Sequence, residues 1–219
     1  MKTSYLVYAL SLVSILLLFI VEQILVVDYI YKTSTKVVVF FFVIFIFHYL
    51  TKRNPGYFST LKMDLKRLKI SLGIGIGSFV ILLGTYFMLK DFIDFATIRD
   101  NLAQKNVTKE TFIFIALYIV IGNSFLEELF FRGFVFKNLL QDNRIAAFIY
   151  SSFLFSIYHT AIFLTWFNVS LFLLALFGLF AIGMIFNWLN ENSSNIFNSW
   201  IVHVIADIAI IIIALLSVF

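Results

Sequence analysis

The chain has 219 residues, of which 62% are hydrophobic and 13% are charged, and its mean hydropathy is +1.02. Soluble domains carry about 25% charged residues, so the composition excludes an ordinary soluble enzyme and indicates an integral protein of the lipid bilayer. The sequence has no cysteine, which excludes disulfides and thiolate-ligated metal sites. A net charge of +4 in a membrane protein reflects loop topology, and we expect no nucleic-acid partner.

The length and the distribution of apolar residues predict the fold class. At about 20 residues per spanning helix, the chain holds about six to eight spans and no sizeable soluble domain. The single proline, Pro55, and the lack of alternating segments of about ten residues argue against a transmembrane β-barrel. We predict an all-α, polytopic membrane protein with one membrane domain over residues 1–219. It should have about seven transmembrane helices, with the active site inside the helix bundle.

The first three spans are expected at residues 5–27, 37–50 and 70–89, and residues 1–110 contain these spans and their loops. Residues 31–36 are expected to form a short loop between the first two spans. Glu22 lies near the end of the first span, where we expect its carboxylate to reach the membrane interface. In the third span, Gly73 and Gly77 share one helix face, which predicts close helix packing at these two glycines.

The loop between the second and third spans predicts the orientation. Residues 52–69 contain six Lys or Arg residues against one acid, Asp64. By the positive-inside rule this loop lies in the cytoplasm, and the N-terminus lies on the same side. The remaining spans are expected at residues 111–140, 145–164, 169–189 and 199–219, with a turn at residues 141–144. We therefore expect a multi-pass protein of the plasma membrane with a cytoplasmic N-terminus.

Two adjacent carboxylates and an arginine interrupt the fourth predicted span, at Glu127, Glu128 and Arg132. A charged side chain at bilayer depth is costly, so such residues usually mark function. Glu128 and Arg132 are four residues apart with the acid first, the favourable order for an ion pair that neutralises both charges. Adjacent helix residues diverge by about 100°, so Glu127 points elsewhere and is expected to have no partner on its own helix.

Two histidines follow in later spans. Glu127 lies fourteen positions before the turn at residues 141–144, and His159 lies fifteen positions after it. In an antiparallel hairpin both side chains then lie roughly 20 Å from the turn, where they can meet. His203 and Asp207 are four residues apart and share one face of the last span.

These residue types are suited to hydrolysis of a carbonyl compound. A carboxylate beside a histidine can hold and deprotonate one water molecule, and we assign this role to Glu127 and His159. His203 would donate a hydrogen bond to the resulting oxyanion. As a carboxylate, Asp207 only accepts hydrogen bonds, so it orients or charges His203 and helps the oxyanion directly only if protonated.

Three motifs carry a family resemblance. The sequence EELFFR at residues 127–132 resembles the EExxxR motif of the CAAX protease and bacteriocin-processing (CPBP, or Abi) family of intramembrane proteases. The sequence FSIYH at residues 155–159 is similar to the FxxxH motif of that family, and HVIAD at residues 203–207 is similar to its HxxxN/D motif. The order, the spacing and the positions in late spans agree. Residues 111–219 therefore resemble a CPBP catalytic core, whereas the first three spans match only as hydrophobic helices.

The resemblance implies peptide-bond hydrolysis in the membrane, with Glu127 and His159 activating water and His203 and Asp207 forming the oxyanion site. Asp207 stands where the prenyl-protein endopeptidase branch carries Asn, which argues against a prenylated CAAX substrate. Bacterial relatives process secreted peptides such as bacteriocins and leader-bearing signals, or confer immunity to them. We expect a hydrophobic or membrane-tethered peptide as the substrate, and the abundance of Phe, Ile, Lys and Asn suggests an AT-rich bacterial genome.

Three alternatives stay open. Glu127, His159 and His203 form a plausible ligand set for one catalytic zinc ion, but the HExxH helix is absent, and we favour catalysis without a metal or other cofactor. A non-catalytic immunity or scaffolding protein of the same fold would bind a membrane-protein partner through its spans. A proton- or ion-coupled transporter also uses buried Glu, His and Asp, but no inverted repeat or pair of broken helices supports it.

Overall fold

The computed structural model describes residues 3–25, 27–52, 65–192 and 195–219. These residues form helices without any strand, and seven helices in this part of the chain are long and apolar enough to cross a membrane. The prediction of an all-α, polytopic membrane protein is therefore confirmed. Such helices satisfy their backbone hydrogen bonds internally, as the lipid interior requires.

The fourth span differs from the others because it is composite. It covers Lys109–Leu140 and consists of α5 (Lys109–Leu117), α6 (Ser124–Glu127) and α7 (Lys137–Leu140), joined by π-helical segments at Tyr118–Asn123 and Glu128–Phe136. The other helices are α1 (Thr3–Phe19, followed by a π-helical turn over Ile20–Ile24), α2 (Tyr29–Thr51), α3 (Leu65–Leu89), α4 (Phe95–Ala103), α8 (Arg144–Phe163), α9 (Val169–Glu191) and α10 (Phe197–Ser217). All of these except the short α4 belong to spans.

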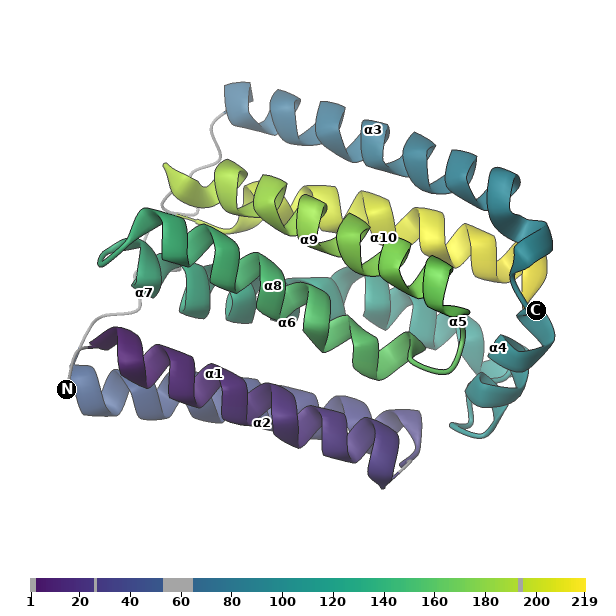
Figure 1. The fold of residues 1–219 in the computed structure, drawn as a ribbon, viewed down its shortest axis with the longest axis horizontal. Coiled ribbons are helices and arrows are strands. Elements are labelled where there is room, and N and C mark those ends of the chain that lie inside the picture. Colours follow the sequence, from purple (N-terminus) through teal and green to yellow (C-terminus); the bar gives the residue numbers. More distant parts are fainter. Residues whose placement is uncertain (1–2, 26, 53–64, 193–194) are drawn as a thin grey trace.

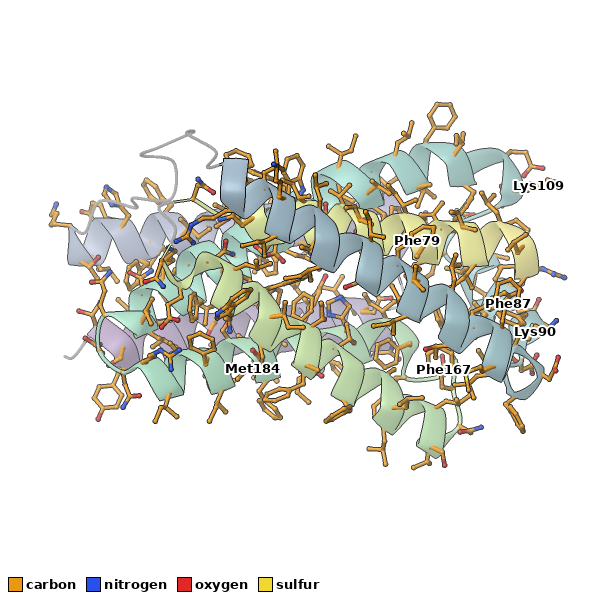
Figure 2. All side chains as sticks on the ribbon, turned by 90° about the horizontal axis from the view of Figure 1, so that it is seen from above. Phe79, Phe87, Lys90, Lys109, Phe167 and Met184 are labelled. Carbon is orange, nitrogen blue, oxygen red and sulfur yellow. The ribbon has the colours of Figure 1, made fainter. Side chains whose placement is uncertain are left out.

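The spans lie side by side along the long axis of the molecule (Figure 1). In this view α3 forms one edge, and the hairpin of α1 and α2 forms the opposite edge. Helices α8, α9 and α10 and the fourth span lie between them, and the two termini lie at opposite ends of the bundle. Lys90 and Lys109, which flank the connection that contains α4, lie at one end together with Phe167 of the α8–α9 loop (Figure 2).

The fourth span also contains an uninterrupted run of buried residues. Every residue from 126 to 136 is buried, including both glutamates and the arginine of the acidic motif. The apolar side chains that face outward come from every span and include Leu16, Phe41, Val80, Phe114, Ile149, Phe177 and Ile210. The bundle is therefore apolar toward the lipid and carries its charged groups inside, the arrangement expected for functional intramembrane charges.

Polar side chains determine where several helices begin. Asn143 accepts a hydrogen bond from the backbone N–H of Ala146 at 2.9 Å at the start of α8. Asn168 caps α9 in the same way at 3.0 Å. These caps satisfy backbone donors that the first turn of a helix leaves unpaired. The turn predicted at residues 141–144 is confirmed, because α7 ends and α8 begins on its two sides.

Two expectations about the N-terminal hairpin are wrong. Residues 31–36 do not form a loop, because α2 begins at Tyr29. Glu22 does not reach the interface, since it is only 5% exposed. Its carboxylate pairs with Lys32 at 2.7 Å and with Lys105. The polar residues that suggested a loop therefore include partners for a buried carboxylate, which would be costly without them.

The orientation in the membrane stays a prediction. It rests on the basic loop at residues 52–69, and residues 53–64 of this loop lie outside the described part of the chain. The cytoplasmic position of the N-terminus therefore depends on the charge count in the sequence alone.

The close approach in α3 occurs at a different glycine from those predicted. A Cβ atom on Gly75 would lie 2.6 Å from Cδ1 and 3.3 Å from Cβ of Ile205 in α10. A Cβ atom on Gly73 or Gly77 would meet no described atom within 4 Å. The prediction of close packing at Gly73 and Gly77 is wrong because both are exposed, while Gly75 and Ser71 form the buried face of α3.

We expect Gly75→Leu to weaken the packing of α3 on α10, whereas Gly73→Leu leaves it intact. Both changes replace glycine with the same strong helix former, so their difference isolates the packing. Overpacking of this kind costs about 1–3 kcal/mol. Thermal unfolding of the detergent-solubilised variants measures the effect, and equal melting temperatures for the two variants would contradict the close approach at Gly75.

Candidate active site

Three spans bring the predicted site residues together inside the bundle. Glu127 lies in α6, His159 in α8, and His203 and Asp207 in α10. Oε2 of Glu127 lies 3.6 Å from Nε2 of His159 and 3.8 Å from Nε2 of His203. Nε2 of His203 also lies 3.8 Å from Oδ2 of Asp207. All four side chains named from the sequence therefore converge on one place.

The two carboxylate oxygens of Glu127 have different surroundings. Oε1 accepts a hydrogen bond from Nδ2 of Asn123 at 2.9 Å and lies 3.3 Å from Nζ of Lys36. Oε2 is buried and has no hydrogen-bond partner among the described residues. Buried polar atoms are normally hydrogen-bonded, so an unpartnered oxygen that faces two histidines is suited to accept a hydrogen bond from a bound molecule.

Sequence reasoning missed both partners of Oε1. The expectation that Glu127 lacks a partner on its own helix is wrong, because Asn123 lies one turn earlier and binds it. The predicted loop at residues 31–36 includes Lys36, yet this residue is 5% exposed and lies inside α2. The spacing of Lys32 and Lys36, one turn apart at the end of an apolar span, is the signal that could have indicated a buried basic face.

Glu128 connects the arginine to the second histidine. Oε1 of Glu128 lies 3.2 Å from Nη1 of Arg132, which is the ion pair expected from the sequence. The same oxygen accepts a hydrogen bond from Nδ1 of His203 at 3.0 Å. The other oxygen accepts one from the hydroxyl of Ser199. Glu128 therefore orients His203, a contact that the sequence did not reveal because the two residues are far apart in the chain.

Hydrogen bonds at Nδ1 determine which nitrogen of each histidine faces the site. Nδ1 of His159 lies 2.7 Å from the carbonyl oxygen of Phe155, and a carbonyl only accepts, so Nδ1 carries the proton. In the neutral ring, Nε2 then presents its lone pair toward Glu127. Nδ1 of His203 donates a hydrogen bond to Glu128. When Nε2 also carries a proton, the ring is cationic, and the nearby carboxylates stabilise that charge.

Arg132 is fully buried and lies beside two aromatic rings. Its Cζ atom lies 4.2 Å from the ring centroid of Phe155 and 4.8 Å from that of Phe186. A planar guanidinium stacks on aromatic faces in a way that an ammonium does not. The ring of His203 contacts the same two phenylalanines, with centroid distances of 5.8 and 5.5 Å. Arg132 and His203 therefore both contact Phe155 and Phe186.

The backbone around the acidic motif is unusual. Glu127 ends a single turn of α-helix that lies between two π-helical segments, with Asn123 ending the first and Glu128 beginning the second. The π-helix is rare, occurs mostly as short interruptions of α-helices, and is frequent at functional sites. Hydrophobic periodicity does not reveal such segments, and the sequence analysis predicted a regular helix here.

The described residues include no group of three or more His, Asp or Glu side chains arranged to hold a metal ion. Glu127, His159 and His203, the ligand set considered for zinc, are neighbours but do not form such a group. Lys36 also places a positive charge beside the Glu127 carboxylate, and this charge opposes binding of a cation at the same group.

One family model matches the C-terminal part of the chain. Residues 109–209 match the family described as type II CAAX prenyl endopeptidase Rce1-like, and the match contains all three motifs. The resemblance to the CPBP and CAAX proteases is confirmed. At the level of the family, the match supports an intramembrane endopeptidase with a peptide substrate. No curated protein and no solved structure matches the chain.

We expect Arg132→Met to lower the free energy of unfolding by about 3–5 kcal/mol, because it leaves the buried charge of Glu128 without its cation. Arg132→Lys should also destabilise the protein, because an ammonium does not stack on the faces of Phe155 and Phe186 as a guanidinium does. Thermal unfolding in detergent measures both effects. The double variant Arg132→Met with Glu128→Gln should be less unstable than the sum of the single variants. Strict additivity would contradict a direct pairing.

Proposed function

On the premise of this family match, we propose that the protein is an intramembrane endopeptidase in which Glu127 and His159 activate the attacking water. The observation that carries the proposal is Oε2 of Glu127, a buried oxygen with no hydrogen-bond partner among the described residues, which faces Nε2 of both histidines. A carboxylate and an imidazole in this relation are suited to general acid–base catalysis through one water molecule.

The proposed reaction proceeds by addition and elimination. The water donates one hydrogen to Oε2 of Glu127 and the other to Nε2 of His159. Glu127 takes the proton as the water oxygen bonds to the carbonyl carbon of the peptide. The carbonyl oxygen becomes negative and accepts a hydrogen bond from Nε2 of His203. Glu127 then returns the proton to the amide nitrogen as the C–N bond breaks, which releases a carboxyl group and an amine.

The remaining site residues act through His203. Glu128 accepts the hydrogen bond from Nδ1 of His203 and keeps its Nε2 directed at the site, while Arg132 balances the charge of Glu128. Asp207 lies on the Nε2 side. As a carboxylate it cannot donate to an oxyanion, so its proposed role is to stabilise the positive charge on His203, which in turn stabilises the oxyanion.

The proposed reaction needs no metal ion. One observation supports this, the positive charge of Lys36 beside the Glu127 carboxylate. The alternative is one zinc ion held by Glu127, His159 and His203, which would supply Lewis-acid activation of water.

The proposed substrate is a hydrophobic or membrane-tethered peptide of the secreted-peptide class, processed in the plasma membrane of a bacterium. Residues 111–219 would form the catalytic core of a single membrane domain, and residues 1–110 would add three spans. The alternative is an immunity or scaffolding protein that retains the fold and binds a membrane-protein partner without cleaving it. Cleavage that depends on Glu127 distinguishes the two functions.

We expect purified protein in proteoliposomes to cleave peptides of this class, and Glu127→Gln and His159→Ala to reduce the rate by about 10²-fold or more. Suitable probes are synthetic precursors of bacterial secreted peptides, together with a prenylated peptide that ends in a CAAX sequence. Mass spectrometry identifies the products. Glu22→Gln is the matched control, because it also changes a buried, lysine-paired carboxylate to an amide but lies outside the site.

The same assay also tests metal dependence and the non-catalytic alternative. Loss of cleavage on addition of a chelator, with recovery on addition of zinc, would replace the metal-free mechanism by the zinc alternative. Cleavage that survives Glu127→Gln would contradict the proposed mechanism. A wild-type protein that binds a peptide without cleaving it, with unchanged affinity in Glu127→Gln, would favour the non-catalytic function.

The role of Asp207 can be tested by comparing two substitutions. If Asp207 acts through its negative charge, then Asp207→Asn and Asp207→Ala should both lower kcat by about 10²-fold, the size of effect expected when oxyanion stabilisation is lost. If Asp207 instead donates a hydrogen bond, Asp207→Asn should keep most of the activity, because an amide can donate. The kcat values of the two variants on one cleaved peptide decide between these roles.

A further inference from the structure

The N-terminal hairpin, which lies outside the segment matched by the family, provides a direct contact to Glu127. Nζ of Lys36 in α2 lies 3.3 Å from Oε1 of Glu127 and donates a hydrogen bond to the hydroxyl of Tyr158 at 2.8 Å. It also donates to Oδ1 of Asn123. An ammonium has three hydrogens to donate, and the ammonium of Lys36 has three acceptors. These three contacts restrain the position of Nζ.

Asn123 links Lys36 and Glu127 through two hydrogen bonds. Its Oδ1 accepts from Lys36, and its Nδ2 donates to Oε1 of Glu127 at 2.9 Å. Oε1 is therefore engaged by two groups on two different spans. Rotation of the carboxylate out of its present plane would break both contacts, so these contacts keep the other oxygen, Oε2, facing His159 and His203.

We propose that Lys36 is a positioning residue for the peptidase reaction. It fixes the carboxylate of Glu127 so that only Oε2 is available to the water. This inference rests on the proposed function. A misplacement of about 1 Å in a catalytic group can cost about 10²-fold in rate, and the contacts of Lys36 restrain the group that must accept the proton. The lysine also supplies the positive charge that a buried carboxylate needs.

Lys32 provides a matched control on the same helix. It lies one turn before Lys36 and forms an ion pair with a buried glutamate, Glu22, at 2.7 Å. It has the same side chain and a similar environment, but its ion pair is with Glu22, and within the described part of the chain it does not contact Glu127. Any effect that both lysines share is structural, and any effect confined to Lys36 acts on the site.

A small cavity adjoins Lys36 on the side of α1 and α8. It is lined by Leu18, Val21, Glu22, Lys32, Lys36, Tyr158, Ala161 and Ile162. This space gives room for a longer cationic side chain at position 36. Lys36→Arg should therefore retain the charge and part of the hydrogen bonding, whereas Lys36→Met keeps the approximate length and loses both.

The test compares kcat and KM of the full-length variants in proteoliposomes on one cleaved peptide. We expect Lys36→Met to lower kcat by about 10²-fold with KM unchanged, Lys36→Arg to recover part of kcat, and Lys32→Met to keep the wild-type kcat. A folded Lys36→Met protein with wild-type kcat would overturn the inference. So would an equal loss of kcat in Lys32→Met, because the effect would then be one of general stability.

A second measurement needs no substrate. In a double-mutant cycle of thermal unfolding, Lys36→Met and Glu127→Gln should give shifts in melting temperature that are not additive, because the two side chains interact directly. Additive shifts would overturn the inference. In the activity assay, Glu127→Gln with full activity would reject the proposed mechanism at Glu127, whereas an inactive Glu127→Gln with a fully active Lys36→Met would reject only the role of Lys36.

Discussion

The site depends on the need to neutralise two adjacent buried carboxylates. Because neighbouring helix residues point about 100° apart, Glu127 and Glu128 pair with different basic side chains, although His203 lies near both. Arg132 on the same helix pairs with Glu128, and Lys36 on α2 pairs with Glu127. Helix α2 must therefore pack against the fourth span at the depth of the motif. Phe40, one turn after Lys36, stacks on Phe130 with ring centroids 3.8 Å apart and holds the two helices in this register.

This neutralisation gives each glutamate one function. The contacts of Glu127 on Oε1 leave Oε2 facing the histidines. The contacts of Glu128 are all structural, since it joins Arg132 and Ser199 to Nδ1 of His203. Two identical side chains thus differ in role only because their partners differ, and the partners follow from the direction in which each residue leaves the helix.

The sequence predicted what depends on local periodicity and on apolar length. The number of spans, the turn between α7 and α8, and the pairing of Glu128 with Arg132 follow from distances along one helix or one hairpin. The meeting of Glu127 with His159 follows from equal depth in that hairpin. Each of these needs only the rise per residue and the angle per residue of a helix.

The sequence did not predict contacts that depend on how separate helices rotate against each other. The pairing of Lys36 with Glu127 and that of His203 with Glu128 join distant parts of the chain, and depth alone does not determine which faces meet. The misassigned loop at residues 31–36 has the same origin. A polar stretch at the end of an apolar span is compatible both with solvent and with a buried acidic partner, and only the neighbouring helix decides between them. The same holds for α3, where Gly75 rather than Gly73 or Gly77 faces α10.

The segment matched by the family lacks one contact of the candidate site, the one that Lys36 makes from α2. Residues 109–209 contain all four candidate site residues named from the sequence, so the motifs alone indicate where the candidate site lies. That segment alone would leave the carboxylate of Glu127 with one neutral donor, Asn123, and no cation on Oε1. A carboxylate buried in a low-dielectric interior without a cation is strongly disfavoured. The positive charge of Lys36 from α2 therefore stabilises the Glu127 carboxylate on the Oε1 side, and the N-terminal hairpin contributes to the candidate site together with the spans that carry the motifs.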